Sequence, residues 1–155
     1  MKDEVLVVYA SSKGRTARIA KLVVDALAAK GVPVVLKNAF EARPEELLGY
    51  RYVVLGCSTY GQGDLQRDFV EFERGMDNLD LTGTKAAVFG SGNSRYAYFA
   101  EAVDILEAKL KILNARLLLP SFRQDMMMGT PEGEETLGWT SALARAVSED
   151  FGKRP

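Results

Sequence analysis

Residues 11–16 have the chemical character of a loop that binds an anion. In order they are Ser11, Ser12, Lys13, Gly14, Arg15 and Thr16. Hydroxyl groups can donate to phosphate oxygens, and the free N–H groups and dipole at the start of a helix favour negative charge. A cation in a first helical turn is unfavourable by about 0.3 to 1 kcal/mol unless an anion offsets it, so Lys13 and Arg15 favour phosphate binding. The alternative is that the hydroxyls only cap the helix.

This loop matches neither of two common nucleotide motifs. The Walker A spacing G-x-x-x-x-G-K-[ST] is absent, and Gly14 is the only glycine of the loop, so the pattern G-x-G-x-x-G is absent as well. The sequence therefore argues against nucleoside triphosphate hydrolysis and against NAD binding.

Two later loops combine glycines with tyrosines and could hold a planar ring. The first contains Ser58, Thr59, Tyr60, Gly61, Gln62 and Gly63. The second contains Ser91, Gly92, Asn93, Tyr96, Tyr98, Phe99 and Ala100. Tyr60 and Tyr96 could stack on the two faces of a ring, although Tyr60 could instead pack on a helix. We expect Tyr98 and Phe99 to make core contacts and to act in binding only through their backbone. Flavin mononucleotide (FMN) carries both a phosphate and a flat heterocycle, so the three loops together predict an FMN site.

Short apolar segments and segments of helical period alternate along the chain. The predicted buried strands are residues 5–10, 32–38, 52–58, 84–90 and 115–119. The predicted helices are residues 16–30, 68–79, 99–113 and 132–148, with a small helix within 39–49. This alternation predicts an α/β fold with a parallel sheet covered on both faces. Ligands of such sheets lie beyond the carboxyl ends of the strands, where the three loops fall.

Composition limits the possible functions further. A length of 155 residues fits one domain over residues 1–155. The absence of His excludes Ser-His-Asp and Cys-His catalysis and His-ligated metal sites, and we expect no metal. A net charge of -1 argues against binding nucleic acid or membranes through bulk electrostatics. The single cysteine, Cys57, fits a reducing cytoplasm and a place in the core.

The three loops, in their order along the chain, resemble the flavodoxin family, in particular its short-chain members. The matching segments are residues 5–9 with the loop 11–16, then 56–61, 89–92, 96–99 and 102–104. The resemblance implies a three-layer, doubly wound, five-stranded parallel sheet of order 2-1-3-4-5. It also implies FMN as cofactor, with the first loop on the phosphate and the other two beside the isoalloxazine ring.

The resemblance implies an electron-transfer protein rather than an enzyme. Such a protein carries single electrons at low potential between a reductase and redox partner proteins, through the semiquinone and hydroquinone states of FMN. In that family the peptide after the glycine matched by Gly61 turns over, and its carbonyl accepts the N5–H of the semiquinone. We expect a cytoplasmic monomer that docks its partners transiently near the flavin edge.

Five positions in the loops depart from the family pattern toward positive or neutral charge. Lys13 and Arg15 stand where the family usually has Thr and Asn, while Gln62, Gly63 and Asn93 replace common acidic residues. A carboxylate near 7 to 10 Å from the ring opposes the second reduction by on the order of 1 to 2 kcal/mol. We therefore predict a second potential less negative than is usual for the family. The net charge also predicts weak electrostatic steering toward partners.

Two other functions are compatible with the sequence. One is an FMN-dependent NAD(P)H:quinone or flavin reductase of flavodoxin-like fold, for which the sequence offers no nicotinamide motif. The other is a module that binds a different phosphorylated ligand or a protein.

Two features outside the loops also allow predictions. Met126, Met127 and Met128 could form an adaptable contact surface, but the favoured prediction is that they fill gaps under the last helix. Trp139 is predicted to anchor that helix.

Overall fold

The computed structural model describes residues 2–11, 13–60, 64–96 and 99–153, with only the backbone of Tyr60. Its elements, in chain order, are β1 Lys2–Ala10, α1 Arg15–Ala29, β2 Val34–Asn38, the 3₁₀ helix η1 Pro44–Gly49, β3 Tyr50–Tyr60, β4 Asp64–Leu65, α2 Arg67–Gly75, β5 Lys85–Gly92, α3 Glu101–Ile112, β6 Arg116–Leu117, β7 Phe122–Asp125 and α4 Glu134–Gly152. The helices and strands alternate as predicted, and η1 is the expected small helix.

The sheet has the order β2-β1-β3-β5-β6, and β7 also pairs with β5. These pairs are all parallel, with Val7 opposite both Leu36 and Val54. Counted together, β6 and β7 take the place of a fifth strand, so the predicted α/β class and the order 2-1-3-4-5 are confirmed. The short β4, which pairs antiparallel with β3, was not predicted.

The predicted extent of the fifth strand is wrong. Its pairing stops after Leu117 and resumes at Phe122. Pro120 lies between the two pieces, and a proline has no N–H to donate to a neighbouring strand. The second piece, β7, carries the chain to the carboxyl end of the sheet.

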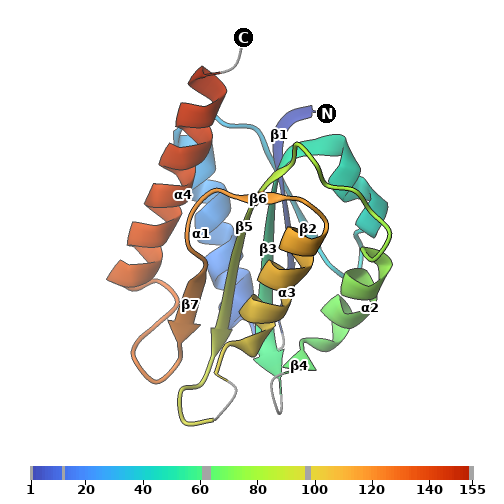
Figure 1. The fold of residues 1–155 in the computed structure, drawn as a ribbon. Helices are drawn as coiled ribbons and strands as arrows, with labels where there is room; N and C mark the ends of the chain where they lie inside the picture. Colours follow the sequence, from blue (N-terminus) through green and yellow to red (C-terminus); the bar gives the residue numbers. More distant parts are fainter. Residues whose placement is uncertain (1, 12, 61–63, 97–98, 154–155) are drawn as a thin grey trace.

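Helices cover both faces of the sheet (Figure 1), and alternate residues of the central strand face the two layers. Val53 and Leu55 belong to the core under α2 and α3. Tyr52 and Val54 belong to the core under α1 and α4. Strands that are buried on both sides therefore account for the continuous apolar segments in the sequence.

The limits of the four α-helices differ from the prediction by one to four residues. The second helix ends at Gly75 instead of residue 79, and α4 continues to Gly152. The third begins at Glu101, because Ala100 adopts the left-handed conformation with φ of 52° and so cannot belong to the helix.

Trp139 anchors the last helix, as predicted. Its ring stacks on Phe122 with a centroid distance of 5.7 Å, and its Nε1 donates to the carbonyl of Pro120 at 2.9 Å. Both partners come from the segment beside β5, so α4 is tied to the edge of the sheet.

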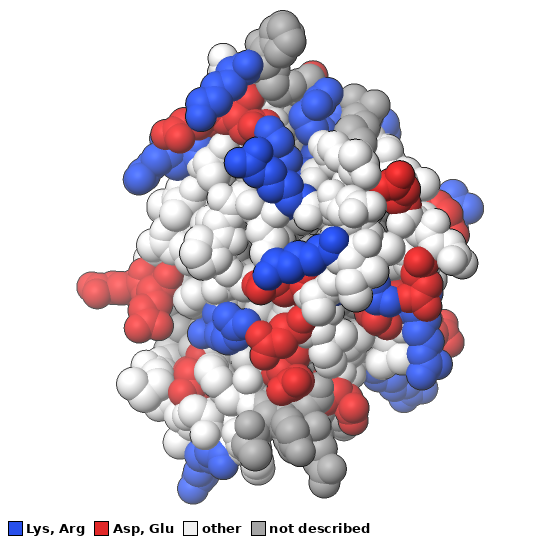
Figure 2. Space-filling view, in the orientation of Figure 1, with Lys and Arg blue, Asp and Glu red and all other residues white. Residues whose placement is uncertain are grey.

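Opposite charges are mixed over the visible face of the molecule (Figure 2). Within the described part of the chain, no helix combines the length and the apolar character needed to cross a membrane.

Candidate functional site

The carboxyl ends of β1, β3 and β5 lie side by side at the lower edge of the sheet in Figure 1. Ala10 is paired with Cys57, and Cys57 with Gly90. The three loops chosen from the sequence follow directly after these positions. The structure therefore brings the described parts of all three loops to one edge.

The backbone of the first loop leaves the start of α1 open. Gly14 has a φ of 85°, its N–H donates to Ser11 Oγ at 3.0 Å, and its carbonyl accepts from Arg18 at 3.0 Å. The N–H groups of Arg15, Thr16 and Ala17 precede that first intrahelical bond and have no partner within the helix. Of the described side chains, none caps α1, and its first turn holds no acidic residue. These features fit an anion better than the capping alternative.

Thr16 links the three loops through hydroxyl groups. Its Oγ1 lies 2.8 Å from Ser58 Oγ and 2.9 Å from Ser91 Oγ. Thr16 is fully buried and Ser91 is 3% exposed, whereas Ser58 is half-buried. The chain of hydroxyls fixes the ends of β3 and β5 to the start of α1.

The side chain of Arg15 makes hydrogen bonds within the chain. Its Nη1 donates to Gln124 Oε1 at 3.1 Å and to the carbonyl of Gly129 at 3.2 Å. These neutral acceptors lie on and just after β7, and the pKa of Glu132, lowered chiefly by the hydrogen bond from Arg18, is lowered further by the charge of Arg15. Lys13 is exposed and takes part in none of the ion pairs in the described part of the chain. Lys13 is thus the cation available to the loop.

The third loop contains a tight turn that presents Tyr96. The Oδ1 of Asn93 accepts from Arg95 N at 2.9 Å, and its carbonyl accepts from Tyr96 N at 3.1 Å. Tyr96 is 66% exposed. Asn93 therefore shapes the turn, and it leaves the turn without the negative charge that an Asp at this position would add.

Asp125 joins this turn to the end of β7 and was missed in the sequence analysis. Its Oδ1 accepts from Ser94 N at 3.1 Å and from Met127 N at 3.0 Å. A further hydrogen bond from the Ser94 side chain is the largest influence that lowers the pKa of Asp125. No local pattern distinguishes this carboxylate, because its partner lies 31 positions away.

The end of β5 approaches the start of α3 closely. A Cβ on Gly92 would lie 2.7 Å from the backbone nitrogen of Ala100, which is itself fully buried. Thr59 Oγ1 accepts from Ala102 N at 3.0 Å and so caps α3. Phe99 packs against the core under α2 and α3, which confirms its predicted core contact.

The remaining predicted site residues lie outside the described residues. They are Ser12, the side chain of Tyr60, Gly61, Gln62, Gly63 and Tyr98.

Cys57 is a core residue, as predicted. It is fully buried, and burial raises the pKa of its thiol to about 12, against the smaller opposing effect of the hydrogen bond from Gln66 N. A thiol with this pKa is not a nucleophile at neutral pH.

The favoured prediction for the three consecutive methionines is wrong. Met126, Met127 and Met128 are 38%, 48% and 80% exposed, so they do not fill gaps under α4. Met76, by contrast, is fully buried in the core. The methionine segment lies at the surface next to the third loop, because Met126 N donates to the carbonyl of Gly92 at 2.9 Å.

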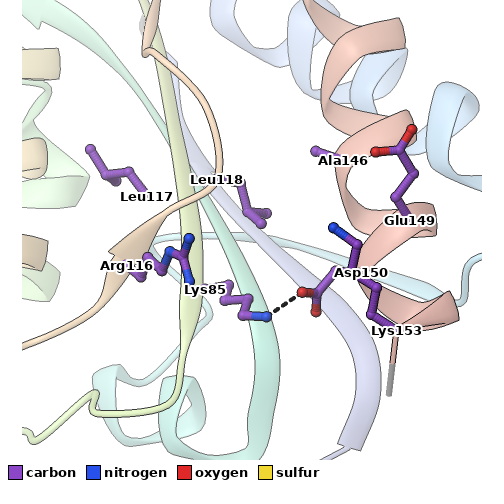
Figure 3. Close-up of a pocket in the computed structure, with 8 residues that line it drawn as sticks. All are labelled: Lys85, Arg116, Leu117, Leu118, Ala146, Glu149, Asp150 and Lys153. Carbon is purple, nitrogen blue, oxygen red and sulfur yellow. Dashed lines mark hydrogen bonds and ion pairs between the residues drawn. The ribbon is translucent and has the colours of Figure 1, made fainter. Parts of the chain in front are cut away.

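A surface cavity of about 450 Å³ lies far from the three loops, between the beginnings of β5 and β6 and the end of α4 (Figure 3). Lys85 points across it and pairs with Asp150, which also accepts from the hydroxyl of Tyr52 at 2.5 Å. These contacts hold α4 against the sheet, so we assign the charged residues of this cavity a structural role.

Comparisons with known proteins agree with the geometry of the three loops. A family model described as flavodoxin matches residues 7–139. A flavodoxin from Maridesulfovibrio salexigens is 39% identical over 145 residues, covering 92% of this chain and 97% of that protein. A probable flavodoxin 2 from Bacillus subtilis is 36% identical, covering 85% of this chain and 86% of the relative. The crystal structure of oxidised flavodoxin 2 from Bacillus cereus has a TM-score of 0.87 and 38% sequence identity, covering 96% of this chain and 99% of that one. The chain belongs to the flavodoxin family, and it is an FMN-binding electron carrier rather than an enzyme.

Proposed function

We propose that residues 1–155 form a single FMN-binding domain in which the first loop holds the phosphate of FMN. The observation that supports this most strongly is the open start of α1 beside the hydroxyl chain of Thr16, Ser58 and Ser91. The phosphate would be bound by the free N–H groups of α1, by hydroxyls of Ser11, Ser12 and Ser58, and by Lys13, while the buried hydroxyl of Thr16 would position Ser58.

The isoalloxazine ring lies, in this proposal, between the loop that follows β3 and the turn that follows β5. Tyr60 and Tyr96 would flank the ring, with Gly61, Gln62 and Gly63 along one edge and the turn at Asn93 along another. The close approach of Gly92 to Ala100 leaves backbone rather than side chain at the base of this slot. Ala100, Phe99 and Tyr98 would act through their backbone.

FMN itself supplies the redox chemistry when it is bound. The chain supplies binding, orientation and electrostatic surroundings. Without His, and with the thiol pKa of Cys57 at about 12, neither of the usual groups that exchange protons near pH 7 is available. An electron carrier needs no such group of its own, because the redox chemistry is that of FMN.

A binding titration tests the phosphate site. We expect FMN to bind more tightly than riboflavin when flavin fluorescence is followed, and the difference to shrink as salt is added. Equal affinity for the two flavins would show that the loop does not hold the phosphate.

An NADPH oxidation assay tests the reductase alternative. We expect the FMN-loaded protein to oxidise NADPH only when a separate reductase is added. Steady NADPH oxidation with quinone and no reductase would favour the alternative.

For its cellular role we propose a cytoplasmic monomer that exchanges electrons with a reductase and with acceptor proteins. The single cysteine supports this compartment.

A further inference from the structure

Ala100 combines backbone strain with full burial at the base of the proposed ring slot. Its φ is 52° and its ψ is 30°, which is the left-handed helical conformation. The Cβ of an ordinary residue opposes this conformation, and short polar residues such as Asn tolerate it best. Within the described part of the chain, Asn114 is the other residue that has a positive φ without being glycine. Of the two, Ala100 is the residue whose conformation calls for an explanation.

The surroundings of Ala100 hold it in this conformation. Ala100 is fully buried and belongs to the core under α2 and α3. Its carbonyl accepts from Val103 N at 3.0 Å, at the start of α3. Two residues further on, Ala102 N donates to Thr59 Oγ1 at 3.0 Å. Backbone strain persists only where the surrounding structure fixes it in this way, and strained residues cluster at binding and active sites.

The N–H of Ala100 is a buried donor without an acceptor. Among the hydrogen bonds of the described residues, none begins at this nitrogen. Buried backbone N–H groups are nearly always paired in folded proteins, so an unpaired one indicates a missing acceptor. A Cβ on Gly92 would lie 2.7 Å from this nitrogen, so the glycine keeps that side of the donor free of a side chain.

We propose that the strained conformation of Ala100 pre-organises the ring slot: it fixes the Ala100 N–H as a donor to an acceptor atom of the flavin ring before FMN binds. This proposal rests on the proposed binding of FMN at the three loops. A flexible residue at the same position would let the N–H take other directions, and FMN would then have to order the backbone on binding. The strain thus lowers the stability of the FMN-free protein and raises its affinity for FMN.

The variant Ala100→Gly tests the proposal, because glycine relieves the strain but also allows other conformations. Flavin fluorescence in a stopped-flow instrument gives the association and dissociation rates of FMN, and urea denaturation gives the stability of the FMN-free protein. We expect FMN affinity to fall by about fivefold through slower association, since the variant occupies the binding conformation for only part of the time. Riboflavin affinity should fall by the same factor, because Ala100 is proposed to contact the ring and not the phosphate.

Two further glycine variants are matched controls. Asn114→Gly changes the other left-handed residue, which lies beyond the C-terminal end of α3, and it should leave FMN affinity unchanged. Ala144→Gly removes a buried methyl group from the middle of α4, so it should lower the urea midpoint without changing FMN affinity. Relative to this second control, the urea midpoint of Ala100→Gly should fall less or should rise, because the loss of the methyl group is offset by the relief of strain.

Three results would overturn the proposal. An unchanged or higher FMN affinity in Ala100→Gly would show that the strain has no part in binding. A urea midpoint that falls at least as far as in Ala144→Gly would show that Ala100 carries no strain. A loss of affinity that comes mainly from faster dissociation would show a weaker contact in the complex instead of lost pre-organisation.

The wild-type protein separates this inference from the proposed function on which it rests. If the wild-type protein does not bind FMN, the proposed function fails first. If it binds FMN, and Ala100→Gly binds FMN equally well, the inference about Ala100 fails alone.

Discussion

At the scale of single residues, the hydroxyl of Thr16 connects the three loops of the site. It contacts Ser58 and Ser91 while fully buried, so it joins three chain segments that are far apart in sequence. Thr84 provides a comparison with Thr16, because its Oγ1 is also buried but has no hydrogen-bond partner among the described residues. The two threonines allow the value of the hydroxyl contacts to be measured by the same substitution.

Thr16→Val should lower the free energy of unfolding by about 1 to 3 kcal/mol, because Ser91 loses its partner in a buried place. FMN affinity should fall as well. Thr84→Val should be neutral or stabilising, since it removes a polar atom that bonds to nothing described. Urea denaturation and a fluorescence titration with FMN measure both effects. Equal losses of stability in the two variants would contradict the proposed role of the hydroxyl chain.

Lys13→Thr should weaken FMN binding by about two- to fivefold and reduce its dependence on salt, because an exposed cation contributes modestly to anion binding. Riboflavin binding should not change. An Arg15→Gln variant provides a contrast, since the contacts of Arg15 with Gln124 and Gly129 predict a loss of stability that appears without FMN. A Lys13→Thr variant that loses FMN and riboflavin affinity alike would contradict the account.

At the scale of elements, the site depends on how closely the end of β5 approaches the start of α3. Gly92 permits this approach, and Thr59 and Asp125 hold the two neighbouring turns. The geometry of the ring slot is therefore set by contacts between elements, not by one loop alone.

Gly92→Ala should destabilise the protein by about 1 to 3 kcal/mol, since its Cβ would overlap with the backbone of Ala100. FMN binding should weaken as the slot is displaced. Gly138→Ala, inside α4 with open space around it, should instead stabilise by up to about 1 kcal/mol. Thermal unfolding with and without FMN compares the two. A harmless Gly92→Ala would show that the close approach is not needed.

The elements of the sheet could be predicted because their strands are buried on both faces and leave continuous apolar segments in the sequence. The three loops could be predicted because their residue types suit phosphate and a flat ring. The partners of Arg15 and Asp125 could not, since they lie 109 and 31 positions away and depend on where β7 ends. The exposure of the methionine segment could not be predicted either, because three consecutive apolar residues show no periodicity that would indicate which side chains are buried.

At the scale of the whole molecule, the titrating groups determine how stability varies with pH. Five carboxyl groups have a lowered pKa, each chiefly through a side-chain hydrogen bond from a neighbour: Glu46 from Lys37, Asp80 from Thr82, Glu107 from Ser121, Asp125 from Ser94 and Glu132 from Arg18. A folded-state pKa below the unfolded value stabilises the fold at higher pH. That stabilisation is lost as the pH falls through the lowered values.

The free energy of unfolding should thus be nearly constant between about pH 5.5 and 7 and fall steeply below about pH 4.5. His is absent and Cys57 has a pKa of about 12, so neither group titrates in the flat range. Urea denaturation of FMN-free protein at several pH values measures this, because the FMN phosphate titrates near pH 6. A clear maximum or slope inside the flat range would contradict it.

The central claim is that this chain carries single electrons on FMN, and that the second reduction of FMN is easier because carboxylates common in the family are absent near the ring. An anaerobic potentiometric titration of the FMN-loaded protein and of its Asn93→Asp variant tests this claim most directly. The variant restores one carboxylate and keeps the oxygen that accepts from Arg95 N. We predict two separate one-electron steps in the wild-type protein, with a second potential less negative than is usual for flavodoxins. In the variant that potential should become more negative by about 40 to 90 mV. A single two-electron step, or a second potential that is strongly negative and unchanged in Asn93→Asp, would contradict the account.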